Sequence, residues 1–309
     1  MSDSNEKYAI LHIEGGLGKN VAASAIIKPL AEKHKDRKLI VACSWPEIFL
    51  NNPHIHRVYS LNAMPYFYDD YINRKDTIVF RREPYFESTH IMQQTPLMQT
   101  WFSMCGLEFD ERVHKPEIHL NMYSEQSFRQ WMLPEGDDRP ILVMQTNGGP
   151  FFEDQQQNVY SWTRDMPFSL AVEINNMALD KGYYVYQICR PNSPLLEGAQ
   201  PINELMNNID LFSILKVANR CLLIDSCLQH AAAAFKIPAT VLWCGTHPEM
   251  FGYKLHNNII ANKPTGESKV HLMNSQYFDY NLAGIPQECP YKDETEIFNK
   301  NKVLSALKL

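Results

Sequence analysis

A glycine-rich turn near the amino terminus has the residue types to bind an anionic ligand. An apolar run at 8–13 is typical of a strand, the segment 14–19 (EGGLGK) follows it, and residues 20–34 have the apolar spacing of a helix. At such a turn, free backbone N–H groups and the positive end of the helix dipole face the ligand. A plain turn that only joins the strand to the helix is the alternative.

The common nucleotide-binding fingerprints do not fit this turn. A Walker P-loop needs a glycine where this chain has Ile13, and a serine or threonine after its lysine, where it has Asn20. The dinucleotide fingerprint needs a small residue at Val21 and an acidic residue at the end of the next strand, where Cys43 stands. The sequence therefore disfavours a kinase and a dehydrogenase.

A second group of polar residues follows an apolar strand in the carboxyl-terminal half. Asp225 comes directly after the strand predicted at 221–224, and Ser226 opens an alanine-rich helix at 226–235. Ser226 can cap that helix while the remaining N–H groups hold a diphosphate without a cation, but a plain helix cap also explains both residues. His230, further along the helix, could reach a phosphate or have a structural role.

Residues 210–253 carry the most specific pattern in the chain, and this pattern resembles the C-terminal domain of glycosyltransferase family 9, the family of the lipopolysaccharide heptosyltransferases. Segments 15–43 and 294–308 resemble the family's opening and closing elements, whereas 44–140 match only loosely. The positions that agree in order and spacing are Asp225, Ser226, His230, Pro238, Gly245, Thr246, Pro248 and Gly252.

The resemblance implies the α/β GT-B fold, with two doubly wound Rossmann-like domains facing a central cleft. It also implies an inverting, metal-independent sugar transfer, with the acceptor in the first domain and a nucleotide diphosphate sugar donor in the second. The polar segment 133–140 is the best linker candidate. The predicted domains are 1–140, 141–262, and a tail with a closing helix, 263–309, that packs back toward the first domain.

The predicted donor-binding residues lie where strands of the second domain end. In the family's Lys-x-Trp segment Tyr160 takes the lysine position, so Arg164 is the nearby cation that could meet the departing diphosphate, unless it is a solvated loop arginine. Arg190 ends the strand at 183–188 and could equally be a surface residue. The full donor set is Asn147, Gly148, Arg164, Arg190, Asp225, Ser226 and His230.

The opening turn departs from the family at the catalytic base. The family usually has Gly-Asp there, whereas Lys19 and Asn20 follow Gly18 in this chain. Glu14 is the nearest carboxylate and the predicted general base, with hydrogen bonding to the glycine loop as the structural alternative. Lys19 could recognise an acceptor phosphate or carboxylate, or be solvated, and Arg81 and Arg82 could form an acceptor loop or a solvated charge cluster. The acceptor set is Gly16, Gly18, Lys19, Asn20, Arg81 and Arg82.

Apolar periodicity predicts alternating strands and helices in both halves, and hence parallel sheets with crossover helices. The expected strands are 8–13, 39–43, 77–80, 141–145, 183–188, 221–224 and 239–243, and the expected helices are 20–34, 95–105, 168–181, 209–218 and 226–235.

The composition is that of an ordinary globular chain of 309 residues, 45% hydrophobic and 21% charged. The 7 cysteines are scattered without CxxC spacing and the histidines form no ligand pair, so no metal and no cofactor is predicted. The net charge of −6 argues against nucleic acid as a partner without ruling it out. A polar start and the lack of about 18 consecutive apolar residues predict a cytoplasmic protein without a transmembrane segment.

The leading functional hypothesis is a glycosyltransferase that moves a sugar from a nucleotide diphosphate sugar onto a hydroxyl, with a glycan or lipopolysaccharide-type acceptor favoured. A hydroxylated DNA base is an alternative acceptor. A catalytically inactive nucleotide-sugar-binding protein and a nucleotide-sugar epimerase of the same fold are the alternative functions.

Overall fold

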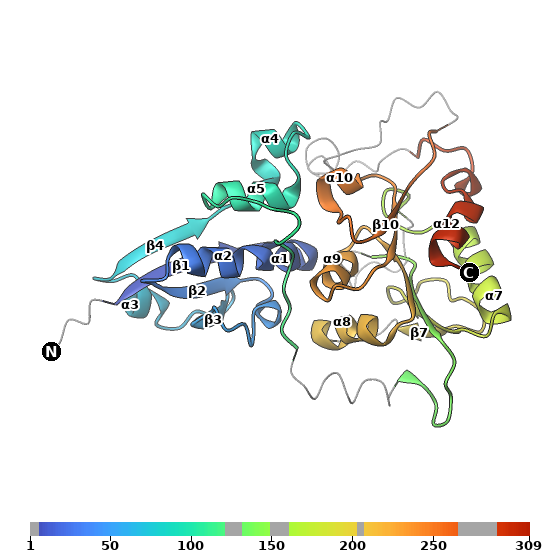
Figure 1. Ribbon diagram of the computed structural model, residues 1–309, viewed down its shortest axis with the longest axis horizontal. Coiled ribbons are helices and arrows are strands. Elements are labelled where there is room, and N and C mark those ends of the chain that lie inside the picture. Colours follow the sequence, from blue (N-terminus) through green and yellow to red (C-terminus); the bar gives the residue numbers. More distant parts are fainter. Residues whose placement is uncertain (1–5, 121–131, 149–160, 203–206, 265–288) are drawn as a thin grey trace. The chain divides into compact units, whose positions relative to one another are not determined.

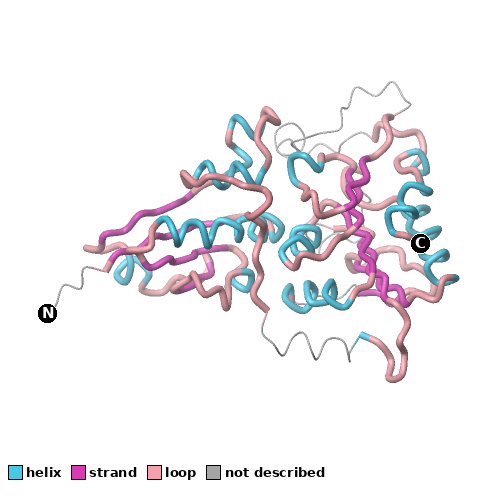
Figure 2. Tube along the Cα trace, viewed as in Figure 1, coloured by secondary structure: helices cyan, strands magenta, loops and turns pink. Residues whose placement is uncertain are grey.

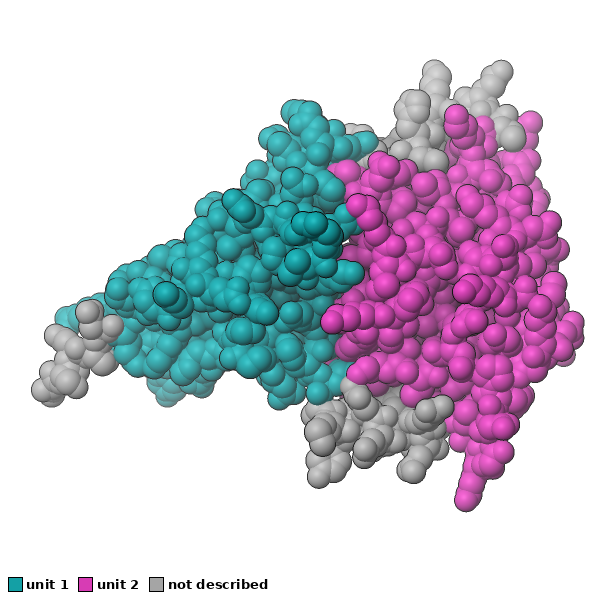
Figure 3. All heavy atoms as spheres, in the orientation of Figure 1, with its two compact units in different colours: residues 1–121 teal, residues 122–309 magenta. Residues whose placement is uncertain are grey.

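The computed structural model describes residues 6–120, 132–148, 161–202, 207–264 and 289–309 (Figure 1). The chain folds into two compact units, residues 1–121 and 122–309, which Figure 3 distinguishes by colour. The secondary structure of each unit alternates between strands and helices along the chain (Figure 2). The strand pairings in both sheets are parallel, as the sequence predicts.

The first unit is built on a four-stranded sheet with the strand order β3-β2-β1-β4. Strand β1 lies between β2 and β4, and most of its residues are buried. A strand that is buried on both faces is expected to be apolar along most of its length, as β1 is. The strands are β1 (Lys7–Ile13), β2 (Lys38–Cys43), β3 (Arg57–Ser60) and β4 (Asp76–Arg81); the helices are α1 (Leu17–Ala23), α2 (Ile27–Lys33), α3 (Phe67–Tyr71), α4 (Ser88–Ile91) and α5 (Leu97–Met104), with short 3₁₀ turns at Ser24–Ile26, Pro46–Ile48 and Pro84–Phe86.

The helix predicted at 20–34 begins earlier and is divided into α1, a 3₁₀ turn and α2. Pro29 has no N–H group to donate to the carbonyl of Ala25, which breaks the α-helical hydrogen-bond pattern there. The hydroxyl of Ser24 donates to the carbonyl of Val21 at 2.6 Å, within the same interruption. Because α1 begins at Leu17, the residues that follow the glycine pair belong to a helix and not to a loop.

The second unit is built on a six-stranded sheet with the strand order β10-β9-β8-β5-β6-β7. Figures 1 and 2 show helices on both faces, with α8 and α9 on one side and α7 and α12 on the other, which makes this unit doubly wound. The strands are β5 (Ile141–Gln145), β6 (Tyr184–Ile188), β7 (Gln200–Ile202), β8 (Arg220–Ile224), β9 (Thr240–Trp243) and β10 (Asn257–Ile260); the helices are α7 (Phe168–Asp180), α8 (Asn208–Val217), α9 (Cys227–Ala234), α10 (Pro248–Phe251) and α12 (Lys300–Leu307), with a 3₁₀ turn at Glu294–Glu296.

Segments at both ends of the second unit are tied to its sheet. The hydroxyl of Tyr186 donates to the carbonyl of Met132, and the guanidinium of Arg139 lies 4.8 Å from the ring centroid of Tyr184. At the other end, Leu307 of α12 is buried in the core, and its carbonyl accepts from Arg220 at 3.0 Å. The boundaries predicted at 140/141 and 262/263, and the return of the tail toward the first domain, stay predictions.

No helix in the described ranges is both long enough and apolar enough to cross a membrane.

Leu222 on central strand β8 provides a test of the second core, in which it is fully buried. Leu222→Ala leaves a cavity there, so we expect the free energy of unfolding of the second unit to fall by about 2–5 kcal/mol in chemical denaturation. The control, Leu195→Ala, truncates a side chain that is 52% exposed and should change stability by less than about 0.5 kcal/mol. Equal effects of the two substitutions would contradict the described core.

Candidate functional site

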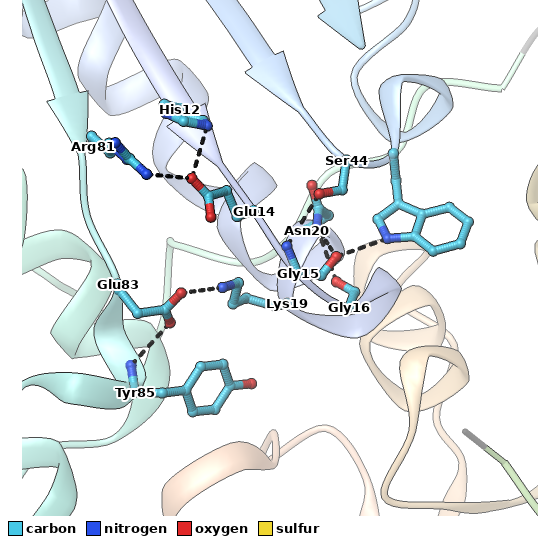
Figure 4. Close-up of polar contacts among 11 residues, drawn as sticks. His12, Glu14, Gly15, Gly16, Lys19, Asn20, Ser44, Arg81, Glu83 and Tyr85 are labelled. Carbon is cyan, nitrogen blue, oxygen red and sulfur yellow. Dashed lines mark hydrogen bonds and ion pairs between the residues drawn. The ribbon is translucent and has the colours of Figure 1, made fainter. Parts of the chain in front are cut away.

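The glycine turn is held by hydrogen bonds to the loop that follows β2 and to α1 (Figure 4). Gly15 has a φ of +92°, donates its N–H to Ser44 Oγ at 3.1 Å and accepts from the indole of Trp45 at 2.9 Å. The side-chain amide of Asn20 donates to the carbonyls of Gly15 and Gly16 at 3.3 and 2.9 Å. Asn20 is fully buried, so its amide stabilises the turn from within.

Glu14 lies at the carboxyl end of β1 and has two basic neighbours. Its Oε1 atom is 2.9 Å from the guanidinium of Arg81 and 3.2 Å from Nε2 of His12. Arg81 is the register partner of His12 on β4, which is why the sheet brings Arg81 to this carboxylate (Figure 4). Burial lowers the pKa of His12, and the charge of Glu14 opposes that shift. Glu14 is half-exposed, so its carboxylate is oriented but still accessible to solvent.

Lys19 has an internal partner, which the sequence did not reveal. Its side chain is 8% exposed and forms an ion pair with Glu83, while its ammonium lies 5.7 Å from the ring centroid of Tyr85. A Cβ atom added at Gly15 would lie 2.9 Å from Nζ of Lys19. The charge of Lys19 is therefore compensated within the first unit, beside the turn (Figure 4).

Two further members of the predicted acceptor set, Gly18 and Arg82, lie outside the glycine turn itself. Gly18 lies in the first turn of α1, and Arg82 is an exposed residue directly after β4. The structure thus brings Glu14, Gly16, Asn20 and Arg81 together around the ends of β1 and β4. Their contact with an acceptor stays a prediction.

The carboxyl ends of β5, β6 and β8 meet at one edge of the second sheet. Oδ1 of Asn147 accepts from the backbone N–H of Arg190 at 2.7 Å, and its Nδ2 donates to Ser193 Oγ at 2.8 Å. A Cβ atom at Gly148 would lie 3.1 Å from Oγ of Ser226, so this close approach favours glycine. The structure therefore brings Asn147, Gly148, Arg190 and Ser226 together, and their contact with a donor stays a prediction.

Ser226 occupies the N-cap position of α9, with extended backbone angles of −157° and 179°. Its hydroxyl makes no capping hydrogen bond, so the predicted side-chain cap is absent. Next to it, the carboxylate of Asp225 accepts from the hydroxyl of Thr246. Burial raises the pKa of Asp225, and the nearby charge of Arg164 opposes the shift. The charge of Arg164 therefore acts on Asp225, which stands directly before the N-cap residue of α9.

His230 lies in the interior of the second unit. Its Nδ1 is 2.7 Å from the hydroxyl of Tyr253, and the ring is 6% exposed. Burial lowers its pKa to about 3, with the charge of His256 as a smaller cause. His230 is therefore neutral at pH 7, and both of its ring nitrogens lie within hydrogen-bond distance of groups inside the second unit, so it offers no positive charge to a phosphate.

Asp165 is a charged residue of this edge that sequence reasoning missed. Its carboxylate is 3% exposed and pairs with the guanidinium of Arg190 at 2.8 Å. It also accepts from the backbone N–H groups of Ser161 at 3.0 Å and Gly148 at 3.4 Å. The aspartate directly after Arg164 was a signal in the sequence, but its partner, Arg190, is remote along the chain. Arg190 was expected as a donor contact, and its charge is balanced by this carboxylate.

Gly149 and Tyr160, both named in the sequence patterns, lie outside the described residues. Within the described ranges no cluster of three or more histidine, cysteine, aspartate or glutamate side chains could hold a metal ion. Arg164 makes no ion pair with another described residue.

No protein-family model matches the chain, and no curated protein matches it either. Solved structures do match. A glycosyl transferase family 9 protein from Veillonella parvula DSM 2008 aligns over 100% of this chain and 97% of its own, with 11% identity and a TM-score of 0.67. The chain has the GT-B fold of this structure.

Two further glycosyltransferase structures agree. E. coli ADP-heptose LPS heptosyltransferase II aligns over 84% of this chain and 92% of its own, at 12% identity and a TM-score of 0.61. The dodecameric iron-containing heptosyltransferase TibC, in complex with ADP-D-β-D-heptose, aligns over 98% of this chain and 76% of its own, at 15% identity and a TM-score of 0.67. These likenesses confirm, at the level of fold, the predicted α/β class and the predicted resemblance to family 9.

The Lys19–Glu83 pair yields a prediction on stability. Glu83→Gln leaves the ammonium of Lys19 buried without a counter-charge, so we expect the free energy of unfolding of the first unit to fall by about 1–3 kcal/mol. Chemical denaturation measures this loss. Glu87→Gln, on an exposed residue of the same segment, is the matched control and should be close to neutral. If both variants are equally stable, Lys19 does not depend on Glu83.

Proposed function

We propose that the protein is a glycosyltransferase that moves a sugar from a nucleotide diphosphate sugar to a hydroxyl group of an acceptor. The observation that carries this proposal is the GT-B fold shared with family 9 structures across the whole chain, together with the Asp225–Ser226 junction at the carboxyl edge of the second sheet. The fold alone admits other chemistries, and the site residues narrow them.

The second unit holds the donor in this proposal. The start of α9, which has no side-chain cap, offers backbone N–H groups that suit a diphosphate, and the turn at Asn147 and Gly148 lies beside it. TibC, of the same fold, is in complex with ADP-D-β-D-heptose, which supports a nucleotide diphosphate sugar as the donor class. Arg164 is the cation proposed to stabilise the departing diphosphate, because its charge is not paired within the described residues.

The first unit holds the acceptor and the base in this proposal. Glu14 is oriented by Arg81 and stays accessible, as a general base for an acceptor hydroxyl must be. An inverting reaction fits one base that activates the hydroxyl directly, without a covalent sugar intermediate. A glycan or lipopolysaccharide-type acceptor is favoured by the resemblance to the heptosyltransferases, in a cytoplasmic setting and without a metal.

A catalytically inactive nucleotide-sugar-binding protein is the second candidate. One observation favours it: the position that carries the family's aspartate is Lys19, whose charge is paired inside the first unit. Under this alternative Glu14 would be part of a surface charge cluster, and only donor binding would remain.

Release of free nucleoside diphosphate from a panel of nucleotide sugars, with and without oligosaccharide acceptors, tests the proposed function. Turnover that depends on one donor and one acceptor is the expected result, and it should persist in excess chelator because α9 and Arg164 neutralise the diphosphate. Turnover restored only by magnesium or manganese would refute the metal-independent mechanism. Donor binding without turnover on any acceptor would identify the inactive alternative.

Glu14→Gln tests the proposed base. The substitution removes the proton acceptor but keeps the size of the side chain, so we expect turnover to fall about 100-fold or more while donor affinity stays the same. Stability should change by less than about 1 kcal/mol, because an exposed pair such as Glu14–Arg81 contributes little. A fall of less than about threefold, or one that accompanies unfolding, would assign the base to another group.

A further inference from the structure

Asp165 lies where three separate segments of the second unit come together, and the proposed mechanism gives it no role. Its Oδ1 atom accepts from the N–H of Gly148 at 3.4 Å, directly after β5. Its Oδ2 atom accepts from the N–H of Ser161 at 3.0 Å and from the guanidinium of Arg190, after β6, at 2.8 Å. One carboxylate thus links the residues that follow the carboxyl ends of β5 and β6 to the loop that carries Arg164.

Further hydrogen bonds hold the same loop against neighbouring strands. The N–H of Met166 donates to the carbonyl of Thr146 at 2.9 Å, and the N–H of Gly245, after β9, donates to the carbonyl of Thr163 at 2.7 Å. A Cβ atom at Gly245 would lie 2.7 Å from Cβ of Thr163, so the two backbones are in close contact. The loop at 161–166 is therefore fixed on both sides of Arg164.

Asp165 is a buried carboxylate whose desolvation is compensated by its neighbours. A carboxylate that is 3% exposed is costly unless hydrogen bonds and an opposite charge compensate it, and here it has both. An apolar residue at this position would carry no desolvation penalty. The carboxylate, in contrast, fixes the guanidinium of Arg190 and the amide of Gly148 in defined directions. Both of these groups belong to the proposed donor site.

We infer that Asp165 is a positioning residue of the donor site, which holds the Gly148 turn, the Arg190 guanidinium and the Arg164 loop in the arrangement that binds a nucleoside diphosphate. The inference rests on the proposed function, because the ligand class comes from it. It adds a residue that acts through its neighbours and does not itself contact the diphosphate. A carboxylate in direct contact would repel that anion, whereas the pair with Arg190 offsets the charge of Asp165.

Calorimetric titration of the full chain with ADP, GDP, UDP and CDP provides the test. For the nucleotide that binds the wild type, we expect Asp165→Asn to raise Kd about 10-fold or more, because the charged hydrogen bond to Arg190 is lost. Asp165→Glu keeps the charge and should recover part of the affinity. Arg190→Met should weaken binding in the wild type but much less in the Asp165→Asn background, since the two side chains act together.

Asp137→Asn is the matched control. Asp137 also pairs with an arginine, Arg139, at 2.6 Å, but it lies before β5, at the opposite edge of the sheet. Its substitution should leave Kd within twofold of the wild-type value. Thermal melting of each variant separates loss of folding from loss of binding.

The outcomes distinguish this inference from the proposed function. If the wild type binds none of the four nucleotides, the proposed function fails and this inference fails with it. If the wild type binds one of them and Asp165→Asn binds it equally well, with or without a lower melting temperature, only this inference is overturned. If Asp165→Asn does not fold, Asp165→Glu decides: its longer side chain should shift Gly148 or Arg190 and raise Kd at least threefold, and an unchanged Kd overturns the inference.

Discussion

The parallel arrangement of the strands is the constraint on which both candidate sites depend. Parallel strands all end at the same edge of a sheet, so the residues that follow them meet there however far apart they are in the sequence. In the second unit β5 lies between β8 and β6, and Gly148, Ser226 and Arg190 meet for that reason. In the first unit β1 lies beside β4, which brings Arg81 to Glu14.

Much of the fold could be predicted because its central strands are nearly continuous apolar runs. Strand β5 has the predicted bounds, Ile141–Gln145, and each of its residues is buried. The edge strands β7 and β10 were not predicted, because Gln200 and Pro201 in one and Asn257 and Asn258 in the other interrupt the apolar pattern. An edge strand contacts fewer neighbours, so its sequence carries less of the signal that identifies a strand.

The sequence indicated which residues follow the strands at the two candidate sites, but not which of their charges are paired within the protein. Sequence motifs identified the cations Lys19 and Arg190, whose partners Glu83 and Asp165 are distant along the chain and belong to no motif. Burial likewise makes His230 neutral, although its place after Asp225 suggested a phosphate contact. Whether a basic side chain offers its charge to a ligand depends on desolvation and on nearby carboxylates, and these follow only from the tertiary structure.

The space beside Gly15 also limits how this sequence can change. Nζ of Lys19 lies close to the glycine, and it pairs with Glu83 beside the turn. An aspartate at position 19 would remove the cation that pairs with Glu83 and add a second negative charge near it. A change at position 83 alone would leave the buried ammonium of Lys19 without its counter-charge. Positions 19 and 83 are therefore coupled, because the side chain at each one limits which side chain the other can hold.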